Sequence, residues 1–493
     1  MEQRKFSGDE DHLYLQLAGR FEALIKSEVL KMGDRLPSVR RISNEHGVSM
    51  STVFQAYYHL ENKGLIASRP RSGYYVRQPV RRVELPAVSR PLSRAMPVSV
   101  ADMAIRVAQY DAQPGFTSLS KAVPGLELLP APRLNKSVVQ SLRSAADHCL
   151  SYSTPWGDIR LRRQIARHSM DWGGSLSAEE VVVTNGCSEA LTLCLQAVAS
   201  PGDTIAVESP AYFGVLQVME SRGLKVLEIP TCPEEGIELD ALESAISRHR
   251  ISACLVVSNF SNPLGSCMPD DKKKKLVGLL ARHGIPLIED DVYGDLFFGK
   301  ERPRTCKIFD RKGLVLLCSS FSKTLAPGYR IGWTAPGIFL EQVRRLKYMS
   351  SCASPTLPQL AIAHFLENGR YDLHLKKLRQ ALHTQYLQYT RSVCNHFPAG
   401  TRLSRPQGGF VLWIGLDGQT DTFELMEQAA ACRISISPGR IFTSQDRYRN
   451  FFRLSFGQPL TPVYENAIRL LGLLASQMEG NERKVRGGKI PDS

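Results

Sequence analysis

The sequence predicts an α/β protein, with a large, mostly parallel sheet covered by helices on both faces and a small winged helix-turn-helix domain before it. Two observations predict this class. From about residue 115 to residue 477, short apolar runs alternate with helical patterns, as in buried parallel sheets with crossover helices. Residues 13–76 instead show helices, a short turn and a basic hairpin. At about 150 residues per domain, the 493 residues allow two to four domains.

The small domain begins with an amphipathic helix, followed by a break at residues 33–38. Apolar residues of this first helix recur at helical spacing: Leu13, Leu17, Phe21, Leu24 and Ile25. Ser38 is a good N-cap for a short second helix over Val39–His46, which Gly47 ends. Residues of a third helix share one face: Val53, Ala56, Tyr57 and Leu60. Helix, short turn and helix in this order predict a helix-turn-helix.

A basic hairpin follows the third helix. Gly64 stops that helix, and Leu65–Ala67 and Tyr74–Val76 predict two strands joined by a basic tip. Residues 12–82 contain 12 Lys and Arg against five Asp and Glu, so they carry +7 of the chain's net charge of +14. This charge on a winged helix favours duplex DNA as the partner. The alternative is a small helical domain with a solvated basic face.

The third helix of such a domain would enter the DNA major groove. Its polar side chains are expected to face base edges or phosphates: Ser49, Ser51, Thr52, Gln55 and Tyr58. Residues around the second helix are expected to hold the DNA backbone: Arg35, Ser38, Arg40 and Arg41. Arg69 and Arg71 of the wing are expected to reach a minor groove or phosphates.

The segment GDRLPSVRRISNEHGVSMSTVFQAYYHLENKGLIASRPRSGYYV resembles the DNA-binding domain of GntR-type bacterial regulators. The resemblance covers residues 13–76, and it implies a DNA-binding domain over residues 1–78. Residues 79–114 then form a linker that contains Pro79, Pro86, Pro91 and Pro97. Prolines at this density favour an extended, semi-rigid tether; an irregular loop packed on the larger domain is the alternative.

Composition excludes several classes of protein. With 43% hydrophobic and 22% charged residues the chain has globular composition. No apolar run reaches the ~18 residues that span a bilayer, and no apolar h-region follows Met1, so neither a membrane span nor a secretory signal is expected. The 11 cysteines form no CxxC pair and show no ligand spacing. We therefore expect neither a metal site nor disulfides. The same cysteine usage is typical of a protein in the reducing cytoplasm.

The large domain shows seven candidate strands: Val181–Val183, Thr204–Val207, Lys225–Ile229, Ala253–Val257, Pro286–Ile288, Val315–Cys318 and Arg330–Trp333. Helical patterns lie between most of them, for example Ser188–Ala199, Leu239–Arg248 and Asp271–His283. Continuous apolar strands with crossover helices indicate a sheet that is covered on both faces.

Four motifs accompany these strands. The first is a strand, a turn at Gly186 and a helix, whose free N–H groups can hold a phosphate. The second is the turn Asn262-Pro263-Leu264-Gly265. Either motif by itself is an ordinary helix start or an ordinary turn.

The third motif, Ile288-Glu289-Asp290-Asp291-Val292-Tyr293, ends an apolar strand, where α/β sheets place ligands. The fourth runs from Ser319 to Gly332 and holds one lysine, Lys323, flanking hydroxyls and Arg330. A lysine between two apolar strands is suited to Schiff-base chemistry, although a lone lysine is usually solvated.

Together the four motifs resemble fold-type I enzymes that use pyridoxal 5′-phosphate (PLP), specifically the class I/II aminotransferases. The resemblance implies a PLP-binding domain over residues 115–479 with a small C-terminal lobe. Lys323 would form the aldimine with PLP, Asp290 would hold the pyridinium nitrogen, and Tyr293 and Asn262 would bond the ring oxygen. Tyr212 would stack on the ring, and Arg453 would grip a substrate carboxylate. Further residues would surround the phosphate: Gly186, Cys187, Ser188, Ser320, Ser322 and Arg330, with Tyr152 from the partner subunit.

With the N-terminal domain, the architecture resembles MocR-type regulators. The resemblance implies a transcriptional regulator that senses PLP, or an amino acid or amine, through aldimine formation. It also implies a homodimer, with each DNA-binding domain reaching over the partner's large domain.

A working aminotransferase with an accessory DNA-binding domain is the alternative function. Every residue needed for transamination is present, and we expect that activity to be vestigial. A DNA-binding protein with an inactive PLP fold is a third reading, against which the intact Lys323 argues. Residues 480–493 are polar and expected to be disordered.

Overall fold

The described part of the N-terminal unit, residues 1–83, is built from three helices and one hairpin in the computed structural model. Its elements are α1 (Glu10–Lys26), α2 (Val39–His46), α3 (Met50–Asn62), β1 (Ile66–Arg69) and β2 (Gly73–Val76). The structure describes residues 10–27, 29–69, 72–77, 83–418 and 420–487. Strands β1 and β2 pair antiparallel, with Ile66 opposite Val76. This is the winged helix-turn-helix that the sequence predicts.

Local chemistry explains the two short helices of this unit. The Ser38 hydroxyl accepts the Arg41 N–H and caps α2, and Gly47 ends α2 with φ of 64°. The Ser49 hydroxyl caps α3 in the same way by accepting the Thr52 N–H. The apolar face of α3 packs onto α1, and Tyr57 is fully buried there while its hydroxyl donates to Pro37 O over 2.7 Å.

The second unit, residues 84–493, contains an eight-stranded sheet. In spatial order its strands are β3 (Met96–Pro97), β7 (Lys225–Ile229), β6 (Thr204–Glu208), β10 (Ala253–Val256), β11 (Leu287–Asp290), β12 (Val315–Ser320), β13 (Gly332–Ala335) and β5 (Val182–Thr184). The five strands from β7 to β12 are parallel, and β13 runs antiparallel to both of its neighbours. The predicted mostly parallel sheet is confirmed.

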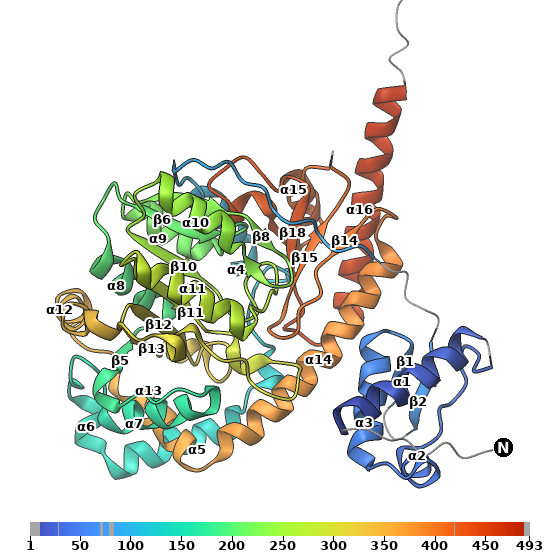
Figure 1. Cartoon of the computed structure of the whole chain (residues 1–493), viewed down its shortest axis with the longest axis horizontal. Helices are drawn as coiled ribbons and strands as arrows, with labels where there is room; N and C mark the ends of the chain where they lie inside the picture. The colour runs from blue at the N-terminus through green and yellow to red at the C-terminus, as the bar shows by residue number, and fades with distance from the viewer. Residues whose placement is uncertain (1–9, 28, 70–71, 78–82, 419, 488–493) are drawn as a thin grey trace, which may run out of the picture. The chain divides into compact units, whose positions relative to one another are not determined.

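Helices cover both faces of this sheet (Figure 1). They are α5 (Ala131–Ser144), α7 (Ile159–His168), α8 (Cys187–Val198), α9 (Phe213–Ser221), α10 (Leu239–Arg248), α11 (Asp270–Arg282), α12 (Leu340–Ser351) and α13 (Thr356–Glu367). The short helix α6 (Ala146–Leu150) packs on α5 and α13 instead. Alternation along β12 shows the two faces, because Val315 packs with α10 and α11 whereas Cys318 contacts Cys194 of α8. Both faces are apolar, as the continuous apolar strands predict.

A smaller lobe follows the sheet in the chain. Its main elements are α14 (Arg370–His396), β14 (Arg402–Leu403), β15 (Val411–Gly415), α15 (Thr422–Ala431), β16 (Ile434–Ser435), β17 (Ser437–Pro438), β18 (Phe451–Ser455) and α16 (Pro462–Gly487). Four of its strands form a sheet in the order β14-β15-β18-β17. Strand β16 pairs instead with β4 (Thr117–Ser118), and β8 (Thr231–Cys232) pairs with β9 (Gly236–Ile237).

The structure differs from the expected linker and tail. From Glu84 onward the chain packs on the large unit, since β3 pairs with β7 and the Ser89 N–H donates to Thr231 O. Residues 101–112 form helix α4 (Ala101–Ala112), which buries Ala104 and Val107. Residues 79–82 of the expected tether lie outside the described residues. Of the expected disordered tail, residues 480–487 continue α16, and residues 488–493 lie outside the described part.

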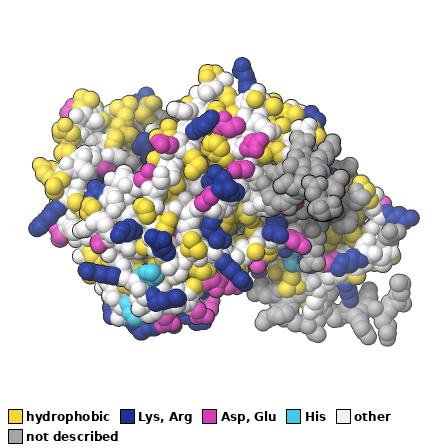
Figure 2. Space-filling model, turned by 90° about the horizontal axis from the view of Figure 1, so that it is seen from above, with side chains coloured by type: hydrophobic (Ala, Val, Ile, Leu, Met, Phe, Trp, Pro, Cys, Tyr) yellow, Lys and Arg dark blue, Asp and Glu magenta, His cyan; other side chains and the backbone are white. Residues whose placement is uncertain are grey.

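Two surface properties bear on partners. Within the described ranges, no helix combines the length and apolarity that crossing a membrane requires. On the face seen in Figure 2, Lys and Arg side chains are interspersed with acidic and apolar ones and do not gather into one patch.

Candidate functional site

The carboxyl ends of the parallel strands bring the predicted cofactor residues together. Asp290 ends β11, Lys323 follows β12, and Asn262 follows β10. Cys187 begins α8, whose residues contact β11, β12 and β13. This is the edge at which open α/β sheets bind ligands.

Lys323 is held inside the site by a backbone carbonyl. Its Nζ donates to Ala122 O over 2.8 Å and lies 6.0 Å from the centre of the Tyr293 ring. Burial and the nearby positive charge of Arg453 lower the pKa of Lys323 to about 8. A larger fraction of this amine is therefore neutral near pH 7 than for an ordinary lysine, as a nucleophilic lysine requires.

Asp290 is buried beside the first turn of α8. Its Oδ1 accepts a hydrogen bond from Cys187 Sγ over 3.5 Å. Burial raises the pKa of Asp290 to about 7, although the Cys187 hydrogen bond and the positive charge of Lys323 oppose this shift. A carboxyl group in this state is suited to meet a cationic partner, which would restore its ordinary ionisation.

Arg453 of β18 is a buried cation, 2% exposed. It donates to Asn262 Oδ1 and to Ser437 Oγ, both over 3.1 Å, and to Ser120 O. Its guanidinium lies over the Phe213 and Phe442 rings, 5.7 and 5.4 Å from their centres. In the described part of the chain it forms no ion pair, and its Nε has no hydrogen-bond partner. Arg453 therefore presents an uncompensated positive charge to the site.

Tyrosines and the Asn262 amide complete this end of the site. Asn262 Nδ2 donates to the Tyr293 hydroxyl over 3.3 Å. Burial raises the pKa of Tyr212. The charge of Arg453 opposes this shift, and the charge of Asp290 adds to it. These side chains thus form one cluster with Lys323.

A second end of the site lies at the N-terminus of α8. Gly186 precedes α8 with φ of 79°, and a Cβ there would overlap the Arg330 guanidinium. Arg330 itself donates to Asn185 O over 3.4 Å. The Ser322 N–H donates to Ser320 Oγ, while Ser322 Oγ is buried without a partner. Backbone N–H groups, an arginine and an unpaired hydroxyl are the donor set that a phosphate needs.

Two residues predicted for the phosphate end lie at the surface. Ser188 is exposed on α8, and Tyr152 is 86% exposed. Tyr152 was expected to act from a partner subunit, and its exposure leaves it accessible to one.

The predicted DNA-contacting residues fall into four groups. Arg35, Arg40, Arg41 and Ser51 are exposed, and Gln55 and Tyr58 are half-buried. Ser38 and Ser49 are exposed, and their hydroxyls cap α2 and α3. The prediction that Thr52 is exposed is wrong, because it is 5% exposed and its hydroxyl bonds Ser49 Oγ over 2.8 Å. The Arg69 side chain and all of Arg71 lie outside the described residues.

Sequence reasoning missed several residues that shape the site. The carbonyls of Ser120 and Ala122, which bond Arg453 and Lys323, belong to no motif. Glu189 of α8 accepts from the Asn185 N–H over 2.6 Å and from Lys347 Nζ over 2.7 Å. In the N-terminal unit, Met50 and Phe54 of α3 are also exposed, and they were not among the predicted DNA-contacting residues because they are apolar. Lys347 lies far from Glu189 in the sequence, and the carbonyls of Ser120 and Ala122 are backbone groups, so no local sequence pattern indicates these contacts.

Comparison with known proteins agrees with this geometry. Residues 126–469 match the family model "Aminotransferase class I and II". The chain belongs to this family. Residues 13–76 match the model "Bacterial regulatory proteins, gntR family". The order of the two matches gives the architecture of a MocR-type member of the GntR regulators.

Relatives and solved structures resemble the chain along most of its length. An uncharacterized HTH-type transcriptional regulator, YjiR, of Escherichia coli K12 is 38% identical over 93% of this chain and 98% of its own length. The HTH-type transcriptional regulator NorG of Staphylococcus aureus is 27% identical over 86% of this chain and 95% of its own. The crystal structure of LysN, an α-aminoadipate aminotransferase from Thermus thermophilus complexed with N-(5′-phosphopyridoxyl)-L-leucine, matches with a TM-score of 0.70 and 26% identity. This match covers 78% of this chain and all of LysN.

The residues present fit PLP. Asp290 meets the need for a carboxylate at a pyridinium nitrogen, and Lys323 supplies an amine of lowered pKa. The unpaired Ser322 hydroxyl and the Arg330 guanidinium over Gly186 fit a phosphate. These donors and this carboxyl group thus fit the chemistry of a phosphorylated pyridine aldehyde.

Proposed function

We propose that this chain is a PLP-dependent, DNA-binding transcriptional regulator whose large unit senses an amino acid or an amine. One observation carries the proposal: a gntR-family unit and a class I and II aminotransferase domain occur in the same chain. A metabolic aminotransferase does not need the first of these units. The relatives with the same two parts bear the names of transcriptional regulators.

PLP, when bound, supplies an aldehyde that links covalently to amines and an electron-poor ring. Lys323 would hold it through Nζ, and Asp290 would keep the ring nitrogen protonated. Tyr293 and Asn262 would hydrogen-bond the ring oxygen, and Tyr212 would lie against the ring face. The phosphate would rest on residues that surround the N-terminus of α8: Gly186, Cys187, Ser188, Ser320, Ser322 and Arg330.

Arg453 supports an effector that carries a carboxylate. Its guanidinium is buried, has no counter-ion among the described residues and lies in the same cluster as Lys323. A carboxylate would form charge-assisted, bidentate hydrogen bonds with it. A small molecule with both an amine and a carboxylate would thus engage the Lys323 end of the site and Arg453 together. An amino acid is such a molecule.

A ligand changes DNA binding only if it favours one arrangement of the protein over another. The segment that follows β4 supports such a difference, because Ser120 O and Ala122 O accept hydrogen bonds from Arg453 and Lys323 Nζ, the two groups that a ligand and the cofactor would engage. A ligand carboxylate would compete with Ser120 O for Arg453. The hydrogen bonds of this segment would therefore differ between the two states.

A homodimer is part of the proposal. Apolar side chains on the surface support it: Leu126, Leu150, Tyr152, Tyr348 and Met349 are each at least 60% exposed. Scattered apolar residues are common on protein surfaces, whereas large exposed ones in number favour an interface. Tyr152 would then reach the phosphate of the partner subunit, and the dimer would bind paired DNA half-sites.

Fluorescence anisotropy with the chain's own upstream DNA tests the regulator. We expect the PLP-loaded chain to bind this DNA with a salt-dependent affinity that changes when a matching amino acid is added. Arg40→Ala should weaken DNA binding with and without the amino acid. Arg453→Gln should leave DNA binding without the amino acid intact but remove the change in DNA affinity that the amino acid causes. Exposed Arg250→Ala, the matched control, should change neither the basal DNA affinity nor this response.

The visible absorbance of the PLP-loaded chain tests the cofactor site in the same samples. Lys323→Ala should abolish the band that the covalent link produces. A chain that shows the band but no specific DNA binding, and that converts an amino acid plus a 2-oxo acid rapidly, would overturn regulation in favour of the aminotransferase. The intact set Lys323, Asp290 and Arg453 is the observation that favours this second candidate.

A further inference from the structure

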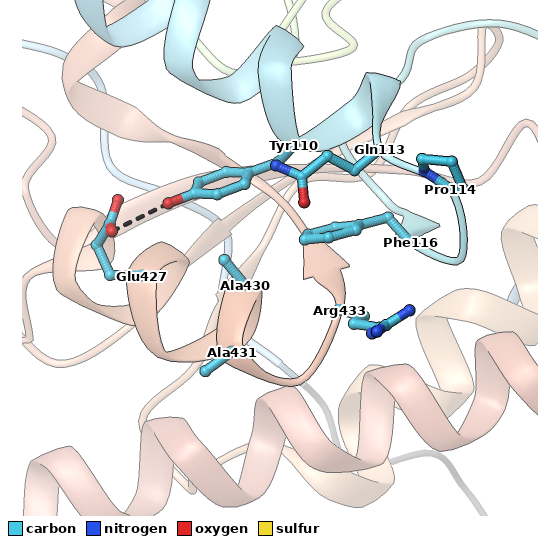
Figure 3. A pocket seen from close by; sticks show the side chains of 8 residues that line it. All are labelled: Tyr110, Gln113, Pro114, Phe116, Glu427, Ala430, Ala431 and Arg433. Carbon is cyan, nitrogen blue, oxygen red and sulfur yellow. Dashed lines mark hydrogen bonds between the residues drawn. The ribbon is translucent and has the colours of Figure 1, made fainter.

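A second concave site lies between the end of α4 and the end of α15 (Figure 3). Its volume is about 490 Å³, which is within the ~300–1,000 Å³ range of small-molecule sites. None of the residues assigned to the PLP site lines it. It is therefore separate from the PLP site.

The floor of this site is aromatic and apolar. The rings of Tyr110 and Phe116 stack with centres 5.7 Å apart and an interplanar angle of 12°. Pro114 and Ala430 add apolar surface beside them. Stacked rings of this kind offer a flat face to another planar group.

Two charged residues stand on opposite sides of these rings, as Figure 3 shows. Arg433 is exposed and, within the described residues, forms no ion pair. Its guanidinium rests on Gly115, where an added Cβ would lie 2.9 Å from Nη1. The absence of a side chain at Gly115 therefore gives Arg433 its place at the edge of the site.

Glu427 forms the other end. Its Oε2 accepts from Arg106 over 2.7 Å and from the Tyr110 hydroxyl over 3.1 Å. Its Oε1 is buried and has no donor. A ligand cannot reach this buried oxygen, but the Tyr110 hydroxyl, whose proton goes to Glu427, keeps an oxygen that can accept a hydrogen bond from a ligand's hydroxyl or amino group.

We propose that this site binds a small planar carboxylate with a hydrogen-bond donor at its far end. The carboxylate would pair with Arg433, the planar body would lie on Phe116, and the donor would reach the Tyr110 hydroxyl oxygen beside Glu427. Glu427, which holds the Tyr110 hydroxyl, and Arg433 lie on opposite sides of the rings (Figure 3). The two polar groups of the ligand are accordingly at opposite ends of it.

Both walls of this site continue into the strands that contact the PLP site. Arg433 O accepts the Thr117 N–H over 2.8 Å, and β4 and β16 pair directly beyond it. The chain after β4 then bonds Arg453 and Lys323 through Ser120 O and Ala122 O. Asp111, one residue from Tyr110, accepts from the Ser118, Ser120 and Ser435 hydroxyls and ties these strands together. The occupant is therefore a second input to the same sensor, a consequence that rests on the proposed function.

Isothermal titration of 4-hydroxybenzoate into the full PLP-loaded chain tests the site. This probe has the carboxylate, ring and donor, and it lacks an amine, so it does not react with the cofactor aldehyde. We expect saturable binding that Arg433→Glu weakens at least tenfold and that exposed Arg250→Ala, the matched control, leaves unchanged. Gly115→Ala, which displaces the Arg433 guanidinium, should weaken binding too. Benzoate, which lacks the donor, should bind several-fold more weakly.

Binding that survives Arg433→Glu but disappears in Arg453→Gln would place the probe at the PLP site and overturn the proposal, as would no binding at millimolar concentration. A saturating probe should also change the affinity of the amino acid that responds at Arg453, and an unchanged affinity would overturn the coupling. The visible absorbance and DNA binding of the unmodified chain, recorded in the same preparation, report on the proposed function independently of these outcomes.

Discussion

Lys347 of α12 offers a sharp test of how the phosphate end is supported. The side chain is fully buried, and its Nζ donates to Glu189 Oε2 over 2.7 Å, to Ser351 Oγ over 2.8 Å and to Ser354 Oγ over 3.0 Å. Glu189 in turn accepts the Asn185 N–H, one residue before Gly186. Replacing Lys347 by Met keeps the length of the side chain and removes all three donors.

The expected cost follows from these contacts. Removing one partner of a buried ion pair costs about 3–5 kcal/mol, and we take about 3 kcal/mol because the Glu189 side chain remains 17% exposed. Unfolding entropy of about 2.1 cal/mol/K per residue gives roughly 0.9 kcal/mol/K for the second unit of about 410 residues. Lys347→Met should therefore lower its Tm by about 3–4 °C.

Differential scanning calorimetry of the full chain measures this change. The transition of the N-terminal unit serves as an internal reference, and exposed Lys275→Met is the matched control. The double variant Glu189→Gln, Lys347→Met removes both charges and should recover at least half of the loss. A Tm of Lys347→Met within about 1 °C of the parent, or a double variant as unstable as the single one, would refute the reasoning about the pair. PLP should also bind Lys347→Met more weakly, because the turn before α8 loses its support.

Three further predictions follow from single residues. Because burial and Arg453 lower the pKa of Lys323 to about 8, its neutral fraction rises about tenfold per pH unit below that value. PLP should therefore load onto the cofactor-free chain faster as pH rises, with a plateau above about pH 8, and stopped-flow rates that do not change with pH would contradict this. Ser49→Ala removes the cap of α3 and should cost the N-terminal unit about 1 kcal/mol in urea unfolding, whereas Ser49→Asp should restore stability and weaken DNA binding. Arg40→Ala should reduce the slope of log affinity against log salt by about one, and an unchanged slope would exclude a phosphate contact.

The sequence was sufficient for the fold and for the centre of the site because both follow from local patterns. Apolar runs mark the buried strands from β6 to β13, and the residues after each strand end, such as Asp290 and Asn262, meet at one edge by the geometry of parallel strands. The positions of Ser38 and Gly47 as helix caps likewise depend only on neighbouring residues. Such features need no knowledge of distant parts of the chain.

Contacts between distant residues could not be predicted. Arg453 bonds a carbonyl 333 positions earlier in the chain, and backbone carbonyls look the same in every sequence. Helix α4 was missed because the prolines before it suggested an extended segment, although Ala104 and Val107 share a buried face. Thr52 was placed at the surface by residue type, yet it lies in the first turn of α3, where its hydroxyl joins the cap.

The segment after β4 has the energetic scale that a ligand-driven switch needs. Its carbonyls at Ser120 and Ala122 accept from two buried cations, and hydrogen bonds to charged groups contribute about 1.5–3 kcal/mol each. Moving a two-state equilibrium from 1:99 to 99:1 requires about 5.5 kcal/mol of differential binding, close to the upper value for the two bonds together. In the PLP-loaded chain Lys323 Nζ would be linked to the cofactor, so a ligand carboxylate that takes Arg453 from Ser120 O removes one of these bonds, about half of the total. We infer that a full response also needs the ligand's amine, because it would displace Lys323 from the cofactor and free Nζ to donate to Ala122 O again, so that both bonds change in a single binding event.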